Sequence, residues 1–293
     1  MTELSSTTAS TPSAVPARRR RQGLVSYLAR RSPLALLLVS LFLFAALFGP
    51  LLAPHSMTDT DLSQANLAPN AGYWLGTDAL GRDVLSRLLG SAGVAAQAML
   101  IVVAIGGVLG AGLGLVAGGL GGITDLVVSR VTEILQGFPT ILIAIVIVAL
   151  LSPSLTNAMI AVGLAAVPDF ARIARSVAIQ LRDREFIQAA RGLGLSEIRI
   201  LLTETLPNMI GPLIIIASFD GAQAIMWEAA LSFLGLGVQP PAPSFGSMLR
   251  DAQNYLNINP WLAITVGVVV SAIILGLNLL GDALSDFYEM SER

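Results

Sequence analysis

The chain has 293 residues, of which 54% are hydrophobic and 12% are charged, and its net charge is -2. A mean hydropathy of +0.75 is too high for an ordinary soluble domain, so the composition indicates a protein of the lipid bilayer. All 17 basic residues are arginine and there is no cysteine. Without lysine the chain has no P-loop and no Schiff-base chemistry, so any ATP must be bound by another chain. The single histidine, His55, has no second His or Cys to pair with, which argues against a metal site, and no catalytic constellation is expected.

Residues 1–32 are predicted to form a disordered, basic tail. Residues 1–17 are rich in Ser, Thr, Ala and Pro and show no apolar periodicity. Arg18–Arg21 follow, and then Arg30 and Arg31. Such a run could bind nucleic acid, but directly before an apolar span it indicates a cytoplasmic N-terminus, and no nucleic-acid partner is expected.

Residues 33–53 are predicted to form the first transmembrane helix, and residues 54–94 an extracytoplasmic segment. The first span has 20 uncharged residues, which as a helix cover about 30 Å, the thickness of the hydrocarbon core. A cleavable signal peptide is disfavoured because the apolar stretch is too long and no cleavage site follows it. Within the outer segment, the simplest interpretation of the run Trp74–Arg87 is a capped surface helix. In it Asp78 and Asp83 would satisfy backbone donors, and Arg82 and Arg87 would be paired locally.

Residues 95–283 are predicted to form a core of five further transmembrane helices, before a C-terminal tail at 284–293. A short inner loop is expected between Asp125 and Arg130. The expected spans are 95–118, 132–151 with a kink at Pro139, one that starts near Leu155, one from Pro207 to about Gly235, and 261–280.

Two smaller patterns lie within this core. Glycines at every fourth position of the second span predict a close packing seam with another helix: Gly106, Gly110, Gly114 and Gly118. Apolar residues at helical spacing predict a short interfacial helix before the last span: Phe245, Met248, Leu249, Ala252 and Leu256.

The stretch 182–208, between the fourth and fifth spans, has the pattern of helix, glycine break, helix. Residues at i, i+3, i+4 and i+7 from Phe186 give the first helix an apolar face. Gly194 interrupts this pattern, Ser196 is the predicted N-cap of the second helix, and Pro207 is expected to end it. Periodicity alone leaves two readings open: a compact knob and a loop that lies flat on the membrane surface.

Four polar or amphipathic side chains fall within the predicted fifth span: Asp220, Gln223, Trp227 and Glu228. Asp220 lies about 16 Å along this helix, near the bilayer midplane. An ionisable group at that depth costs at least about 2.5 kcal/mol unless it is paired or faces water. Two interpretations remain open, a hydrogen bond that holds helix packing and a lining of the route taken by a polar substrate.

The stretch 182–208 also resembles the cytoplasmic coupling loop of bacterial ABC-importer permeases. Their signature is Glu-Ala-Ala, three residues, Gly, nine residues and Ile-x-Leu-Pro. Gln188-Ala189-Ala190, Gly194 and Leu206-Pro207 fall at those spacings, with Gln188 in place of Glu and Glu204 in place of Ile. Glu185–Arg191, Trp74–Arg87 and Ser232–Pro241 are similar to the dipeptide, oligopeptide and nickel branch of this family.

The resemblance implies an all-α membrane protein with six transmembrane helices, the type I ABC importer permease fold and cytoplasmic coupling helices. It implies ATP-driven import of dipeptides or oligopeptides, with nickel or another small solute as the alternative. The implied partners are a homologous permease subunit in a heterodimer, two ABC ATPase subunits that hold ATP and Mg, and an extracytoplasmic substrate-binding protein. This chain would then be a transport subunit that binds no cofactor of its own. A secondary transporter is less favoured because no internal repeat is evident.

In this family the knob sits in a groove of the ATPase subunit. The ATPase-coupling residues implied are Glu185, Gln188, Ala189, Ala190, Arg191, Gly194, Leu206 and Pro207. Segments predicted to be inner carry 14 of the 17 arginines and outer segments carry the other 3. This distribution predicts a multi-pass protein of the bacterial plasma (inner) membrane whose knob and both termini are cytoplasmic.

Overall fold

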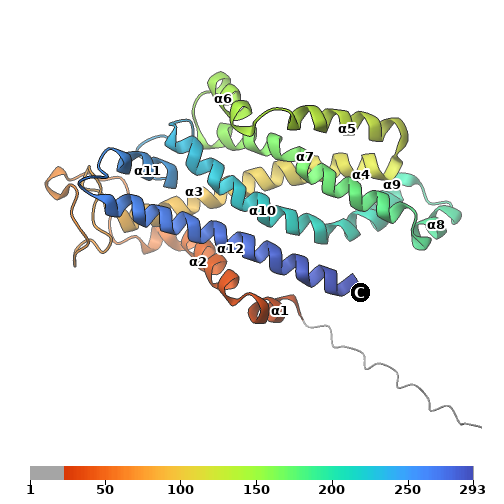
Figure 1. The fold of residues 1–293 in the computed structure, drawn as a ribbon, viewed down its shortest axis with the longest axis horizontal. Coiled ribbons are helices and arrows are strands. Elements are labelled where there is room, and N and C mark those ends of the chain that lie inside the picture. Colours follow the sequence, from red (N-terminus) through yellow and green to blue (C-terminus); the bar gives the residue numbers. More distant parts are fainter. Residues whose placement is uncertain (1–22, 293) are drawn as a thin grey trace, which may run out of the picture.

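A computed structural model describes residues 23–292, whose regular elements are all helical apart from one isolated bridge between Thr77 and Asp83 (Figure 1). The predicted basic run Arg18–Arg21 lies outside these residues. The helices are α1 (Leu24–Arg31), α2 (Pro33–Leu52), α3 (Val84–Ile105), α4 (Ala111–Leu120), α5 (Gly122–Gln136), α6 (Thr140–Leu151), α7 (Leu155–Arg182), α8 (Glu185–Gly192), α9 (Glu197–Ile200), α10 (Leu206–Phe233), α11 (Phe245–Gln253) and α12 (Pro260–Glu292).

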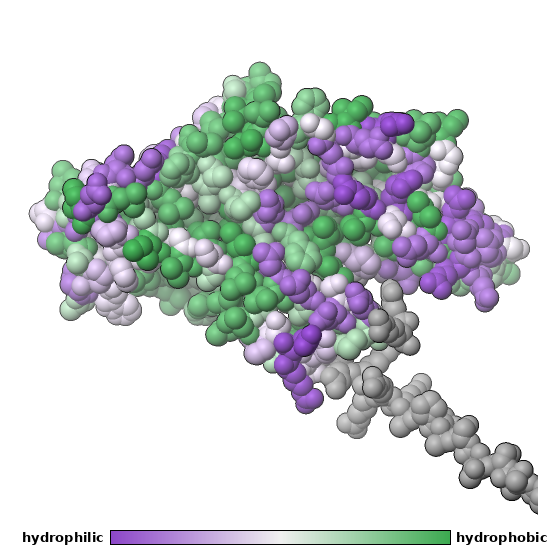
Figure 2. All heavy atoms as spheres, in the orientation of Figure 1, coloured by the Kyte–Doolittle hydropathy of each residue, from purple (hydrophilic) through white to green (hydrophobic). Residues whose placement is uncertain are grey.

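Within residues 23–292, five continuous helical stretches are long and apolar enough to cross a bilayer. They are α2, α3 with α4, α7, α9 with α10, and α12, and they run side by side along the long axis of the molecule (Figure 1). Apolar side chains cover the middle of this bundle, while polar side chains gather at its two ends (Figure 2). A belt of this kind is expected where lipid tails surround a protein.

The third predicted span is not a straight helix. α5 and α6 bend by 84° at the break that contains Pro139, so they make a sixth span only as a broken pair. The inner loop expected between Asp125 and Arg130 is wrong, because these residues lie within α5. Gly121 and Gly122 both have positive φ angles, 68° and 59°, which turn the chain sharply enough for α5 to start directly after α4.

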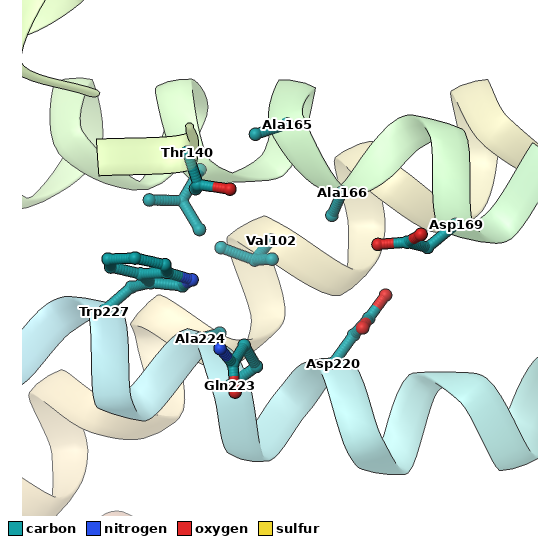
Figure 3. Close-up of a pocket in the computed structure, with 10 residues that line it drawn as sticks. Val102, Thr140, Ala165, Ala166, Asp169, Asp220, Gln223, Ala224 and Trp227 are labelled. Carbon is teal, nitrogen blue, oxygen red and sulfur yellow. The ribbon is translucent and has the colours of Figure 1, made fainter. Parts of the chain in front are cut away.

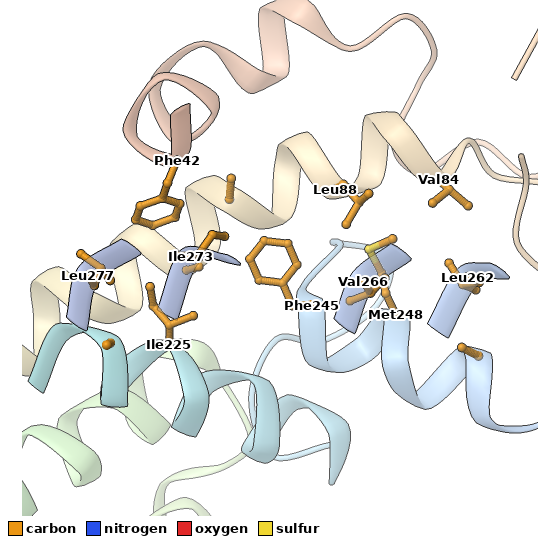
Figure 4. Packing of buried hydrophobic residues seen from close by; sticks show 14 residues of the cluster. Phe42, Val84, Leu88, Ile225, Phe245, Met248, Leu262, Val266, Ile273 and Leu277 are labelled. Carbon is orange, nitrogen blue, oxygen red and sulfur yellow. The ribbon is translucent and has the colours of Figure 1, made fainter. Parts of the chain in front are cut away.

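The main apolar core is formed by side chains of α2, α3, α10, α11 and α12 (Figure 4). The predicted short helix is present as α11, but its Phe245 and Met248 side chains are almost fully buried in this core, and Leu256 lies beyond its end. α11 begins with a capping box formed by Ser244 and Ser247, and its apolar face points into the bundle rather than along the membrane surface.

The glycine seam is confirmed. Gly106, Gly110, Gly114 and Gly118 all face α7, at distances too short for a β-carbon. η2, a π-helical turn at Gly106–Gly110, joins α3 to α4 within one continuous helix. That helix therefore starts at Val84 rather than near residue 95, and the segment between the first two spans is shorter than predicted.

Both predicted tails contain helix. Residues 24–31 form α1, and α12 continues through the predicted tail to Glu292. The two helices stabilise each other, since Leu28 is buried against Ala283 and Leu284, and the Tyr27 ring contacts the Phe287 ring at a centroid distance of 5.3 Å. The prediction of disorder was therefore wrong for 24–31, because the apolar partner of this stretch lies at the far end of the chain.

Candidate coupling knob and polar cavity

The stretch 182–208 forms a compact knob at one end of the bundle (Figure 1). α7 leads into α8, and Gly194, with a φ of +79°, reverses the chain toward α9. Ile187 and Ile200, each 1% exposed, anchor the two short helices. The structure thus has the predicted helix, glycine break and helix, with Ser196 at the N-cap position, although its side chain makes no capping hydrogen bond.

An ion pair braces the two arms of the knob. The Arg191 guanidinium donates from Nε to Glu197 Oε1 at 2.8 Å and from Nη2 to Oε2 at 3.1 Å. This two-point hydrogen bond to the Glu197 carboxylate raises the pKa of Arg191 above its usual value. A third hydrogen bond, from Arg191 Nη1 to the carbonyl of Arg182 at 3.3 Å, connects the same side chain to the end of α7.

The surface of the knob combines polar and apolar side chains. Glu185, Gln188, Ala189 and Gly194 are exposed, as a docking role would require, whereas Ala190 and Arg191 are half-buried. Leu193 and Ile198 are 81% and 69% exposed. Exposed apolar residues of this size, clustered on a projecting element, are typical of a protein-docking surface.

Pro207 does not end the second arm. It lies in the first turn of α10, and the helical backbone is continuous from Glu197 to Phe233 through a π-helical segment at Leu201–Thr205. Proline is tolerated at this position because it has no N–H group to donate. As a result α9 and α10 form one continuous helical stretch, and the knob is joined to the bundle by helix on its α10 side.

A cavity of about 140 Å³ lies between α7 and α10, at the level where α3 and α6 approach them. Its walls combine polar and small apolar side chains: Val102, Thr140, Val162, Ala165, Ala166, Asp169, Asp220, Gln223, Ala224 and Trp227. The structure brings Asp220, Gln223 and Trp227 together on one face of α10, as their spacing predicted (Figure 3).

Glu228, the fourth predicted residue, does not line this cavity. Its side chain is fully buried, and Oε1 accepts a hydrogen bond from Ser232 Oγ at 2.7 Å. One position beyond Trp227, the helix has turned by about 100°, so Glu228 faces the interior near α11 instead. The prediction that Glu228 lies on the substrate route is therefore not supported by its position.

Asp169 of α7 is the cavity residue that the sequence reasoning missed. Its carboxylate points toward that of Asp220 (Figure 3). Outside the cavity, Asp169 Oδ1 accepts from Gln136 Nε2 at 3.2 Å and lies 3.6 Å from Arg172 Nη2. A weak signal existed, since Asp169 follows Pro168 inside a predicted span, but only the packing of α7 against α10 places it opposite Asp220.

A second ion pair connects α5 with the inner half of α7. The Arg175 guanidinium donates from Nη2 to Asp125 Oδ2 at 2.7 Å and from Nε to Oδ1.

No group of three or more His, Cys, Asp or Glu side chains that could hold a metal ion occurs within residues 23–292.

Long apolar helices, a projecting helical knob and a polar cavity among the helices define a membrane transport subunit. A family model described as the binding-protein-dependent transport system inner membrane component matches residues 110–290. A second, the N-terminal TM domain of oligopeptide transport permease C, matches residues 30–69. The chain therefore belongs to the binding-protein-dependent inner membrane permeases of ABC importers.

Several curated relatives match along most of the chain. The dipeptide transport system permease protein DppC of Alkalihalophilus pseudofirmus is 40% identical over 251 residues, which cover 86% of this chain and 83% of that protein. The probable D,D-dipeptide transport system permease protein DdpC of Escherichia coli (strain K12) is 35% identical, over 90% of this chain and 89% of that protein. The glutathione transport system permease protein GsiD of Pectobacterium atrosepticum is 35% identical, over 85% and 83%.

The fold also resembles a chain of the MetNI methionine ABC transporter in an inward-facing conformation. The TM-score is 0.56, with 20% identity, and the match covers 67% of this chain and 93% of that one. At this identity the likeness shows the fold alone. The type I ABC importer permease fold expected from the sequence is thereby confirmed.

Proposed function

We propose that this chain is the permease subunit of an ATP-driven peptide importer and that it has no ATPase site of its own. Support for the substrate class comes from relatives named for dipeptide and glutathione transport. ATP and Mg belong to two ABC ATPase subunits, and a homologous permease completes a heterodimer. An extracytoplasmic binding protein delivers the substrate. In this arrangement the knob and both termini are cytoplasmic.

One structural relationship supports a mechanism by which the knob controls the cavity. The two helices that enter and leave the knob, α7 and α10, also carry the carboxylates on the two sides of the polar cavity, Asp169 and Asp220. Because α9 is continuous with α10, a force applied to the knob by a closing ATPase reaches the cavity wall through helix rather than through a flexible loop. The knob residues from Glu185 to Pro207 then couple ATP hydrolysis to exposure of the cavity on alternate sides of the membrane.

The coupling is tested by reconstitution in proteoliposomes. The complete importer is expected to take up radiolabelled dialanine only with ATP, and the two permease subunits alone are expected to take up none under a proton or sodium gradient. Gradient-driven uptake by the permeases alone at the full rate would instead support a secondary transporter.

The route is tested by Asp220→Ala. If Asp220, Gln223 and Trp227 line the path of a polar substrate, this variant assembles normally with its partners but takes up dialanine more slowly. Assembly is measured by co-purification of the ATPase subunits, independently of uptake. Normal uptake by a normally assembled complex would leave Asp220 with a packing role only.

A further inference from the structure

The cavity between α7 and α10 contains one buried acceptor without a donor. Asp220 Oδ2 is buried and accepts no hydrogen bond from any of residues 23–292. Leaving a buried carboxylate oxygen without a donor is unfavourable, and the facing carboxylate of Asp169 adds repulsion between like charges (Figure 3). A positive group placed between the two carboxylates would relieve both costs.

The walls of the cavity do not supply that positive group. Its ten lining residues include two acidic side chains and no basic one. The nearest arginine contact to Asp169 is that of Arg172, at 3.6 Å between side chains that are 64% and 49% exposed. Exposed pairs of this kind contribute little, and Arg172 is not among the residues that line the cavity.

The remaining lining residues fit a primary ammonium group. An ammonium has three N–H donors, and the cavity presents two carboxylates and the Gln223 side-chain carbonyl as acceptors. The Trp227 ring also lines the cavity (Figure 3), and an indole ring can attract a cation over its face. Val102, Val162 and Ala166 provide an apolar wall for the carbon atoms next to the nitrogen.

The volume of the cavity and the number of its acidic side chains limit which ligand it can hold. A volume of about 140 Å³ has room for roughly five water molecules, which suits the amino end of a peptide but not a whole oligopeptide. A divalent metal ion is a poorer match, because such ions take about six ligands and the described residues contain no group of three His, Cys, Asp or Glu side chains. The cavity chemistry therefore favours an organic ammonium over nickel.

We infer that this cavity is a transient binding station for the N-terminal ammonium group of the transported peptide, held between Asp169 of α7 and Asp220 of α10. This inference rests on the proposed peptide-import function. Because its two carboxylates come from the two helices that flank the knob, a relative movement of α7 and α10 would separate them and release the ammonium. The same contact would select peptides with a free amino terminus over blocked ones.

Trp227 allows a direct test that does not depend on transport. The chain has three tryptophans, and Trp74 and Trp261 lie outside the cavity, so a Trp74→Phe, Trp261→Phe chain keeps Trp227 as its one tryptophan. The same chain with Trp227→Phe added gives the fluorescence of the partner subunits, which is subtracted. This chain is assembled with its partner subunits in nanodiscs. Dialanine and ethylammonium chloride are expected to change Trp227 fluorescence in a saturable manner. N-acetyl-dialanine, which lacks the ammonium, is expected to leave it unchanged.

Substitutions then test which side chains bind the ammonium group. Asp169→Asn and Asp220→Asn should each raise the ethylammonium concentration for half-maximal response by about tenfold or more, because each removes a charged acceptor. Asp220→Glu should retain part of the response, and Asp282→Asn, an exposed aspartate on α12, is the matched control and should behave as the parent. Folding of each variant is checked by co-purification with the ATPase subunits.

The outcomes separate this inference from the proposed function. An equal response to N-acetyl-dialanine, or an unchanged response in both Asn variants, would overturn the ammonium station even if ATP-driven dialanine uptake is normal. Conversely, a saturable, Asp-dependent ethylammonium response in a complex that imports no dialanine with ATP would support the station and contradict peptide import.

Discussion

Arg82 and Asp251 are 169 positions apart in the chain, yet Arg82 Nη2 donates a hydrogen bond to the Asp251 carboxylate at 2.9 Å. Asp78 accepts from Arg82 Nε at 2.7 Å and lies 3.5 Å from Arg87 Nε. The Arg82 and Arg87 side chains are only 8% and 2% exposed. This cluster connects the outer segment, the start of α3 and α11 at the end of the bundle opposite the knob.

We expect Asp78→Ala to destabilise the chain by about 3 kcal/mol or more, because it leaves two buried guanidinium groups without their main counter-ion. Removing one partner of a buried ion pair lowers the free energy of unfolding by more than the intact pair contributes to it, because the remaining charge is left buried and unpaired. Thermal unfolding of the detergent-purified permease measures the effect as a lower midpoint.

Two further variants provide unfolding midpoints with which that of Asp78→Ala is compared. Asp251→Ala should cost less than Asp78→Ala, since the Asp251 side chain is one-third exposed and water can take its place. Asp59→Ala, an exposed change in the same outer segment, should leave the midpoint where it is. If Asp78→Ala unfolds at the same temperature as Asp59→Ala, the cluster does not hold the outer end together.

The glycine seam predicts a sharp difference between two glycines in α4. A β-carbon at Gly114 would lie 2.6 Å from the Ala174 β-carbon and closer still to the Ala171 carbonyl oxygen, whereas one at Gly112 meets nothing within 4 Å. Gly114→Ala must push α4 away from α7, at a cost of about 1 to 3 kcal/mol. Gly112→Ala should be neutral or slightly stabilising. Thermal unfolding of the two purified variants compares them, and equal midpoints would contradict a seam of this closeness.

A similar pair of glycines lies in the knob. Gly194 has a φ of +79°, so Gly194→Ala strains the turn between α8 and α9 by about 1 to 2 kcal/mol. Gly192 ends α8 with a helical backbone and has open space around it, so Gly192→Ala is the control. We expect Gly194→Ala to lower ATP-driven dialanine uptake about fivefold or more, with ATPase subunits still bound. Uptake equal to that of Gly192→Ala would show that the turn geometry does not matter for coupling.

Much of the fold followed from patterns that are local in the chain. The glycine repeat, the helix break at Gly194 and the common face of Asp220, Gln223 and Trp227 all depend on spacing along one helix, and the structure contains all three. The local pairing of Arg82 with Asp78 was also expected, whereas the expected surface helix was wrong, because Arg87 is only 2% exposed. Helical periodicity is sufficient for such features because it is a property of a single element.

What the sequence could not provide is which elements meet. Three pairs each join elements whose contact is decided by packing: Asp169 with Asp220, Asp251 with Arg82, and Asp125 with Arg175. The same limit explains why α11 was expected at the membrane surface. Its apolar stripe is equally consistent with lipid and with a protein core, and only the neighbouring helices decide between them.

The orientation of the chain can be tested without background labelling, because the sequence contains no cysteine. Trp74 in the outer segment and Leu193 in the knob are 70% and 81% exposed, so a single cysteine at either position should react readily. In intact spheroplasts, a membrane-impermeant maleimide is expected to label Trp74→Cys but not Leu193→Cys. After permeabilisation Leu193→Cys should be labelled as well, provided that the ATPase subunits are not co-expressed. The arginine distribution requires this pattern, and labelling of Leu193→Cys from outside would place the knob on the wrong side for any contact with an ATPase.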